Sequence, residues 1–170
     1  EDVYRIDQGI ERYMTKTQKK TADFMEGCME LGGLLGGWSE SEIVELKKYG
    51  HALGMAFQIT DDIMDYRETT ETTGKPVGND LREGLLTYPL LSIVNDDNKD
   101  KLLADIKALN NGGDEQAIID YVISQGGIDN TLAVANQYCK DALAALDAVR
   151  DFPGKEFLVM AVENLADRKV

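Results

Sequence analysis

Three carboxylates lie close together in the middle of the chain, at Asp61, Asp62 and Asp65. On a helix of 3.6 residues per turn, Asp61 and Asp65 lie one above the other and Asp62 lies beside them. Carboxylates this close repel each other unless they are solvated, protonated or neutralised by a cation. Oxygen ligands of this kind suit magnesium, which is usually completed by water and by substrate phosphates. The spacing therefore predicts a magnesium site that accepts a phosphorylated substrate.

A simpler interpretation of the same residues is a solvated helix face, since the chain carries a net charge of -13. The setting of the acids argues against it. They follow the segment MAFQI at residues 55–59, which is apolar except for one amide. The acids therefore border a core, and both interpretations are carried forward.

Four other residues could face a bound anion: Lys20, Thr21, Gln58 and Lys75. A lysine on a helix surface or in a loop is ordinarily a solvated charge. Gln58 is harder to explain in this way, because an amide in an apolar helix needs a hydrogen-bond partner once it is buried. Basic groups opposite a carboxylate cluster can form a polyphosphate site, in which metal bridges acids and phosphate while lysines balance the remaining charge.

The only histidine and the two cysteines give no metal-site pattern. His51 has no second histidine or cysteine at ligand spacing, so we expect a structural role for it. Cys28 and Cys139 lack CxxC spacing and fall in amphipathic stretches, which favours two buried thiols in a reducing compartment. No signal-peptide pattern opens the chain and no apolar run approaches the 18 residues that span a bilayer. We therefore expect a cytoplasmic protein.

The composition favours one all-α domain over residues 1–170. The 170 residues are 43% hydrophobic, with only 3 prolines and few alternating β-branched runs. The 31 acidic residues outnumber the 18 basic ones. This balance argues against a general nucleic-acid or anionic-membrane partner, because either would need a basic surface.

Apolar periodicity predicts the order of the helices and one long loop. Helices are expected over residues 4–14, 18–35, 40–66, 85–94, 98–109, 115–124, 128–150 and 157–170. The polar, glycine-bearing segment 68–84 is expected to be a loop, and its length is typical of a functional lid or a disordered segment.

Two local patterns predict how the longest helix begins and packs. Ser39 and Glu42 form the capping-box arrangement at its start. Gly50 and Gly54 each cost about 1 kcal/mol relative to alanine inside a helix, so close packing against another helix is the expected compensation. The helix at residues 128–150 carries an apolar seam that should pack on a partner helix.

Two segments resemble the second aspartate-rich motif, and the loop after it, of the trans-isoprenyl diphosphate synthases. They read FQITDDIMDY over residues 57–66 and GKPVGNDLREG over residues 74–84. The segment Lys20-Thr21-Ala22 is similar to the upstream lysine-threonine motif of that family. The resemblance covers nearly all of the 170 residues, but only the C-terminal half of a family member.

The resemblance implies an isoprenoid synthase helical bundle that ionises an allylic diphosphate with Mg²⁺ and adds isopentenyl diphosphate head to tail. Asp61, Asp62 and Asp65 match the magnesium positions, Asp61 most directly. Lys20 and Lys75 match lysines on the allylic diphosphate. The positions that match residues lining the pocket where the allylic cation forms are Thr21, Gln58 and the neighbouring Phe57. A homodimer is the assembly that the resemblance implies.

Two departures from the family pattern limit these expectations. Leu85 stands where many members have a second lysine. The first aspartate-rich motif and the basic residues that hold isopentenyl diphosphate are absent from the 170 residues. We therefore expect a fragment of a synthase with little or no activity alone. A non-catalytic subunit of a prenyl synthase complex is the alternative, and a class I terpene cyclase is disfavoured because its second metal motif is usually of an Asn/Ser/Glu type. Product chain length and the preferred allylic substrate are not encoded in these residues.

Overall fold

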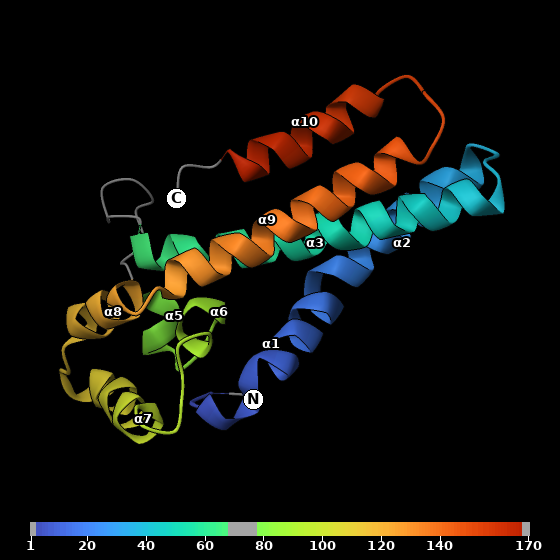
Figure 1. Cartoon of the computed structure of the whole chain (residues 1–170). Helices are drawn as coiled ribbons and strands as arrows, with labels where there is room; N and C mark the ends of the chain where they lie inside the picture. The colour runs from blue at the N-terminus through green and yellow to red at the C-terminus, as the bar shows by residue number, and fades with distance from the viewer. Residues whose placement is uncertain (1–2, 68–77, 168–170) are drawn as a thin grey trace. The chain divides into compact units, whose positions relative to one another are not determined.

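Helices make up every regular element in residues 3–67 and 78–167, the ranges that the computed structural model describes. The all-α prediction is confirmed for these residues (Figure 1). The elements are η1 (Ile6–Gln8), α1 (Gly9–Thr17), η2 (Gln18–Ala22), α2 (Asp23–Leu35), α3 (Glu40–Arg67), α5 (Asn79–Arg82), α6 (Tyr88–Leu91), α7 (Lys99–Ala108), η3 (Leu109–Asn111), α8 (Glu115–Ser124), α9 (Gly127–Asp147) and α10 (Lys155–Ala166).

The chain divides into two compact units, which we describe separately. Unit 1 holds the residues up to Tyr13 together with Asp61–Leu132. Unit 2 holds Met14–Thr60 and the segment from Ala133 to Lys169. The long helix α3 contributes its last turns to unit 1 and the rest to unit 2. That residues 1–170 form a single domain stays a prediction.

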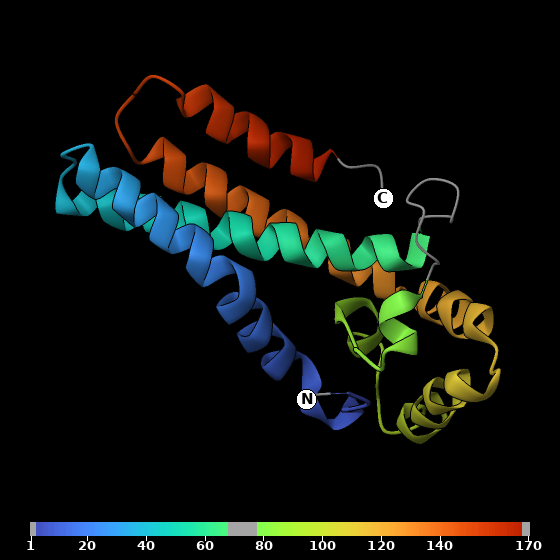
Figure 2. The same ribbon diagram turned by 180° about the vertical axis from the view of Figure 1, so that it is seen from behind.

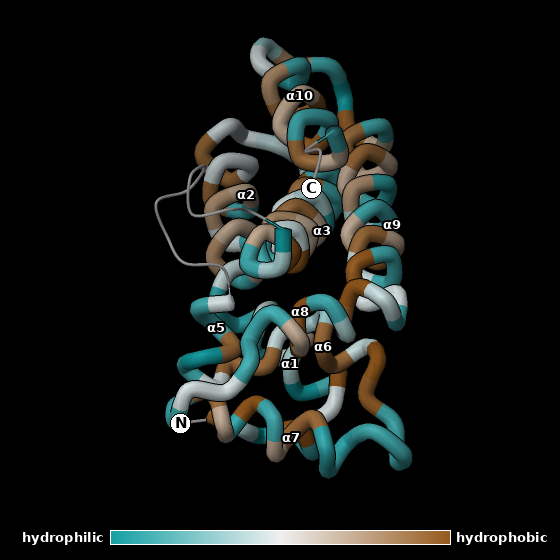
Figure 3. Tube along the Cα trace, turned by 90° about the vertical axis from the view of Figure 1, so that its left-hand side faces the viewer, coloured by the Kyte–Doolittle hydropathy of each residue, from teal (hydrophilic) through white to brown (hydrophobic). Residues whose placement is uncertain are grey.

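The core of unit 2 lies between α3, α9 and α10, which run side by side with α2 against α3 (Figures 1 and 2). Polar and apolar residues alternate along α9 (Figure 3). The predicted seam begins at Leu132, which is only partly buried, and its other members are buried, namely Ala135, Cys139, Ala142, Leu146 and Val149. The prediction that the seam packs on a partner helix is confirmed, because most of it shares one cluster with α3 and α10 residues.

Two glycines let the backbone of η2 and α2 approach α3 closely. A Cβ atom added to Gly54 would lie 2.6 Å from the Cα atom of Ala22. A Cβ atom added to Gly50 would lie 2.6 Å from the carbonyl oxygen of Met25. No real Cβ atom tolerates such distances to backbone, so the predicted close packing at both glycines is confirmed.

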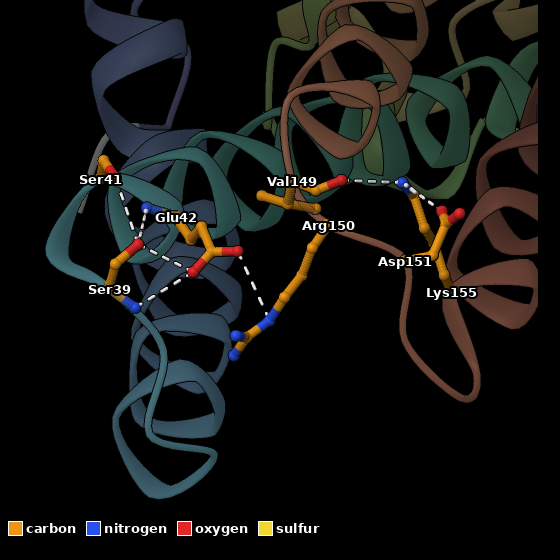
Figure 4. A network of polar contacts seen from close by, with 7 residues as sticks. All are labelled: Ser39, Ser41, Glu42, Val149, Arg150, Asp151 and Lys155. Carbon is orange, nitrogen blue, oxygen red and sulfur yellow. Dashed lines mark hydrogen bonds and ion pairs between the residues drawn. The ribbon is translucent and has the colours of Figure 1, made fainter.

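The start of α3 is held by the predicted capping box (Figure 4). The backbone N–H of Ser39 donates to Glu42 at 3.1 Å, and the N–H of Glu42 donates to the Ser39 hydroxyl at 3.4 Å. The Ser39 hydroxyl also donates to the Glu42 carboxylate at 2.8 Å, and this bond, together with the one from the Ser39 N–H, lowers the pKa of the Glu42 carboxyl. Arg150 lies 3.4 Å from Glu42 and stacks over the Trp38 ring at 4.7 Å, which ties the helix start to the chain after α9.

In unit 1, the first residues of the chain pack with the short helices that follow α3. Tyr13 and Tyr88 meet edge to face with their ring centroids 5.7 Å apart. The buried apolar side chains include Ile6, Leu81, Leu86, Leu90, Ile106, Ile118 and Val122. Asp114 caps α8 by accepting the N–H of Ala117 at 3.0 Å.

Three expectations from the sequence are wrong. Residues 79–82 form the short helix α5 instead of loop, residues 78, 83 and 84 are turn, and residues 68–77 of the expected loop lie outside the described ranges. The helix expected over 85–94 is shorter, Tyr88–Leu91. Its start fits the position of Pro89 in the first turn, where a missing N–H is tolerated. Cys28 is exposed on α2, whereas Cys139 is buried as expected.

No helix among the described residues is both long enough and apolar enough to cross a membrane.

We expect Gly54→Ala to lower the free energy of unfolding by about 1–3 kcal/mol, because the new methyl group meets backbone that cannot move away. Gly27→Ala is the matched control. A Cβ atom at Gly27 in α2 meets nothing within 4 Å, so the substitution should stabilise the helix by roughly 0.5–1 kcal/mol. Urea unfolding followed by circular dichroism measures both, and equal stabilisation by the two variants would contradict the close packing.

Candidate functional site

The three aspartates at the end of α3 lie in three different environments. Asp61 is exposed, Asp65 is partly buried, and Asp62 is buried with only 6% of its surface exposed. All three belong to unit 1. Each carboxylate is therefore stabilised in a different way, by solvent at Asp61 and by protein groups at the other two.

Asp62 is held by a tyrosine from the start of the chain. The hydroxyl of the buried Tyr13 donates to Asp62 Oδ2 at 2.5 Å. A hydrogen bond to a carboxylate is shorter and stronger than one between neutral groups. This contact fixes the Asp62 side chain and compensates part of the cost of burying it.

Asp65 is held by the backbone at the start of α5. Its two carboxylate oxygens accept the N–H groups of Asn79 at 3.0 Å and Asp80 at 3.1 Å. The turn also requires Gly78, which has a φ of 75°, and a Cβ atom there would collide with the Glu115 carboxylate. Glu115 in turn pairs with Arg82. The segment that begins at Gly78 is thus fastened to the last turns of α3.

The charge of Asp65 is nevertheless unfavourable in this setting. Burial raises its pKa to about 6, and the negative charges of Asp80 and Glu115 add to the rise, while the hydrogen bonds from Asp80 and Asn79 oppose it. The folded state therefore holds this proton more tightly than the unfolded chain does. The contribution of Asp65 to stability is present below its ordinary pKa of 3.8 and is lost as the pH rises through about 6.

The acids of α3 fit a magnesium ion in donor chemistry, although their side chains do not converge on one point. All three offer hard oxygen donors, which Mg²⁺ prefers. Asp61 is exposed to solvent, and the raised pKa of Asp65 marks a place where a cation would be stabilising. The carboxylates of Asp62 and Asp65 point to Tyr13 and to the α5 backbone. Mg²⁺ usually takes only one or two carboxylates and keeps its waters, so Asp61 is the best placed of the three.

Lys20 and Thr21 lie on a π-helical turn, η2, between α1 and α2. Turns of this kind are rare and often occur at functional sites. Lys20 is exposed, and Thr21 is partly buried. The Thr21 hydroxyl donates to the Gln58 side-chain oxygen at 3.1 Å, which gives the amide in the apolar stretch of α3 the partner that its position requires. The structure thus brings together Thr21 and Gln58 within unit 2.

Two further predicted site residues are Phe57 and Lys75. Phe57 is 38% exposed on α3 in unit 2. Lys75 lies outside the described residues. The residues of η2 and Gln58 belong to unit 2 and the acids to unit 1, so each group is described within its own unit.

Sequence reasoning missed Tyr13 and the backbone groups that hold Asp65. Tyr13 is 49 residues from Asp62 along the chain, and no local pattern links them. The N–H groups of Asn79 and Asp80 carry no side-chain signal at all. Gly78 was the one available sign, since a glycine before a polar pair is typical of a tight turn.

The structure is similar to those of solved prenyl synthases. The heptaprenyl diphosphate synthase of Staphylococcus aureus matches with a TM-score of 0.87 and 27% identity, over 99% of this chain and 54% of that one. A polyprenyl synthase from Caulobacter crescentus CB15, solved with calcium and isoprenyl diphosphate, matches with a TM-score of 0.84 and 28% identity, over 98% and 52% of the two chains. Fold and acidic cluster together define the class: an all-α isoprenoid synthase fold.

The sequence comparisons place the chain within that class. The family model for polyprenyl synthetase matches residues 2–125, so the chain belongs to the polyprenyl synthetase family. Heptaprenyl diphosphate synthase component 2 of Geobacillus stearothermophilus is 34% identical over 148 residues, which is 87% of this chain and 46% of the relative. The chain spans about half the length of the curated relatives it matches.

The bond between Tyr13 and Asp62 can be tested by a double-mutant cycle. We expect Tyr13→Phe to cost about 1.5–3 kcal/mol of unfolding free energy at pH 7, because it removes a hydrogen bond to a buried carboxylate. The same substitution in an Asp62→Asn background should cost clearly less, since the charge is gone. Urea unfolding of the four proteins gives the coupling energy, and a coupling near zero would show that the contact carries no stability.

Proposed function

We propose that this chain is the metal-binding half of a prenyltransferase that adds isopentenyl diphosphate head to tail to an allylic diphosphate. The observation that carries the proposal is the acidic cluster at the end of α3. It lies inside the range matched by the polyprenyl synthetase family model, and burial and neighbouring charge raise the pKa of Asp65 there. A carboxylate in that condition gains from a cation, and an ion with open positions can also hold a diphosphate.

Asp61 is the residue we assign to direct contact with Mg²⁺, with Asp65 and Asp62 behind it. Mg²⁺ supplies charge neutralisation to the diphosphate as the carbon–oxygen bond of the allylic substrate breaks. Tyr13 and the α5 backbone hold the side chains of Asp62 and Asp65 in place through hydrogen bonds. Fixed charges that need no rearrangement are the effective ones in catalysis.

Lys20 and Lys75 are the cations that we assign to the diphosphate group of the allylic substrate. Lys20 is exposed on η2 and is followed by the partly buried Thr21. Together with Gln58 and Phe57, Thr21 would line the pocket of the allylic chain. The hydrogen bond from Thr21 to Gln58 satisfies the Gln58 amide oxygen, which leaves a wall suited to an electron-poor carbon and poor in free nucleophiles.

The proposal includes a second part of the fold, which this chain does not hold. The matched relatives are about twice as long as the aligned region. Large apolar side chains are exposed on α2, namely Phe24, Leu31, Leu34 and Leu35, with exposed fractions of 56–82%. A face of this kind suits the apolar helices of the complementary half of the fold. The isolated chain should therefore have little or no transferase activity. A homodimer and a cytoplasmic location stay predictions.

A second candidate function is a subunit that serves a partner without turning substrate over itself. The Geobacillus relative is named as a component of a synthase, a name that fits a protein working with a partner chain and does not by itself distinguish the two candidates. The two candidates differ at the acids. A catalytic half needs Asp61 and Lys20 for activity, whereas a non-catalytic subunit needs only its contact surface.

The matched pair Lys20 and Lys19 tests the proposal, because both are exposed lysines on η2. We expect this chain to bind farnesyl diphosphate in isothermal titration calorimetry only when Mg²⁺ is present. Asp61→Ala should weaken that binding by roughly tenfold or more and Lys20→Ala by a similar factor, since each removes a charge on the diphosphate. Lys19→Ala should leave it within about twofold.

The same variants in the complete gene product test turnover. There we expect Asp61→Ala to lower Mg²⁺-dependent incorporation of isopentenyl diphosphate by about 10³-fold, which corresponds to roughly 4 kcal/mol of barrier. Normal turnover by this variant would refute the catalytic role and leave the subunit function. Robust transfer by the 170-residue chain alone would refute the need for a second half.

A further inference from the structure

A second group of metal-ligand side chains lies in unit 2, and none of its members is a residue of the proposed reaction. Asp23, Glu26 and His51 each offer one ligand atom, and these atoms all lie within 4.8 Å of one another. Among the described residues, this is the group of three metal-ligand side chains whose ligand atoms lie this close together. It joins an imidazole nitrogen to two carboxylates and draws them from two helices, α2 and α3.

The close approach of the two helices creates the group. Asp23 and Glu26 are three residues apart and so lie on one face of α2. His51 follows directly after Gly50, the residue whose missing side chain lets α3 lie against the backbone of Met25 and Glu26. The expectation that His51 is structural rested on the lack of a second histidine or cysteine at ligand spacing. The carboxylates of Asp23 and Glu26 come near His51 only through the tertiary packing of α2 on α3.

The contacts that surround His51, Glu26 and Asp23 leave ligand atoms available for a cation. His51 Nδ1 lies 3.5 Å from Glu26 Oε2, and both side chains are about one-third exposed. The other Glu26 oxygen lies 3.5 Å from Lys47, but Lys47 is nearer to Glu30, at 3.0 Å. Asp23 accepts a hydrogen bond from Gln18 at 3.2 Å through one oxygen only. Each of the three residues therefore keeps at least one ligand atom directed at the group.

We propose that Asp23, Glu26 and His51 bind one divalent first-row transition-metal ion, with Zn²⁺ the best fit. One imidazole and two carboxylates suit this class of metal, and the remaining position is open to water. Ligand atoms about 2.0–2.2 Å from a tetrahedral Zn²⁺ lie about 3.3 Å from each other. The side chains reach that spacing by small rotations, because Asp23 is exposed and the other two are only partly buried.

This site differs in chemistry from the acidic cluster of α3. It has a nitrogen donor, which Mg²⁺ disfavours, and it needs no diphosphate. Bound metal would clamp α2 to α3 and stabilise the folded state increasingly as the free Zn²⁺ concentration exceeds the dissociation constant. The inference does not depend on the proposed prenyltransferase function, since none of its residues takes part in that site.

Calorimetric titration of the metal-free chain with Zn²⁺ at pH 7.5 tests the proposal. We expect one equivalent to bind and the melting temperature to rise with Zn²⁺. His51→Ala and Glu26→Gln should each weaken binding by roughly tenfold or more. Cys28→Ser, which removes the exposed thiol of α2, and Asp61→Asn, which alters the other cluster, should leave it unchanged.

The outcomes separate cleanly. Circular dichroism shows whether each variant is folded, and Glu26→Gln retains the shape of the side chain if His51→Ala is unstable. The proposal is supported if His51→Ala and Glu26→Gln lose Zn²⁺ binding while Cys28→Ser and Asp61→Asn keep it. Absence of saturable binding by the parent chain, unchanged binding in the folded His51→Ala or Glu26→Gln protein, or loss in Cys28→Ser would overturn it.

Discussion

The need to stabilise three carboxylates at the end of α3, those of Asp61, Asp62 and Asp65, is the constraint on which the functional part of this structure depends. Three acids within five residues of one helix are unfavourable unless something stabilises each charge. The fold stabilises the three charges in three different ways. Solvent surrounds Asp61, the Tyr13 hydroxyl bonds to Asp62, and the N–H groups at the start of α5 bond to Asp65. The last arrangement is incomplete, because burial and the nearby charges of Asp80 and Glu115 still raise the pKa of Asp65. A cation bound beside Asp61 would relieve this remaining cost.

Within unit 2, close packing of η2 and α2 on α3 positions the other residues of the proposed sites. The capping box at Ser39 sets the start of α3, and Gly50 and Gly54 allow the π-helical turn and α2 to press against it. That contact places the Thr21 hydroxyl on the Gln58 amide, and it also brings His51 beside Asp23 and Glu26. One packing feature thus accounts for a wall of the proposed substrate pocket and for the proposed transition-metal site.

The sequence was most informative about features that local patterns within one helix determine, such as where the helix begins and ends. The capping box and the apolar periodicity placed α3 within one residue at its end, and α8 was predicted with its observed limits, Glu115–Ser124. The family resemblance pointed to the acids through sequence motifs alone. Tertiary contacts limited the rest. The link from Tyr13 to Asp62, the backbone groups that hold Asp65, and the exposure of Cys28 all depend on which segments meet. The helix expected over 85–94 spans only Tyr88–Leu91.

The central claim is that a bound metal ion with a diphosphate stabilises the negative charge of the acidic cluster. Carbon-detected NMR of the Asp65 carboxyl group, titrated between pH 3 and pH 8, measures this directly. In the metal-free chain we expect a midpoint near 6, and with Mg²⁺ and farnesyl diphosphate present the midpoint should fall by at least about one unit. A midpoint near the ordinary value of 3.8 that Mg²⁺ and the diphosphate leave unchanged would contradict the account.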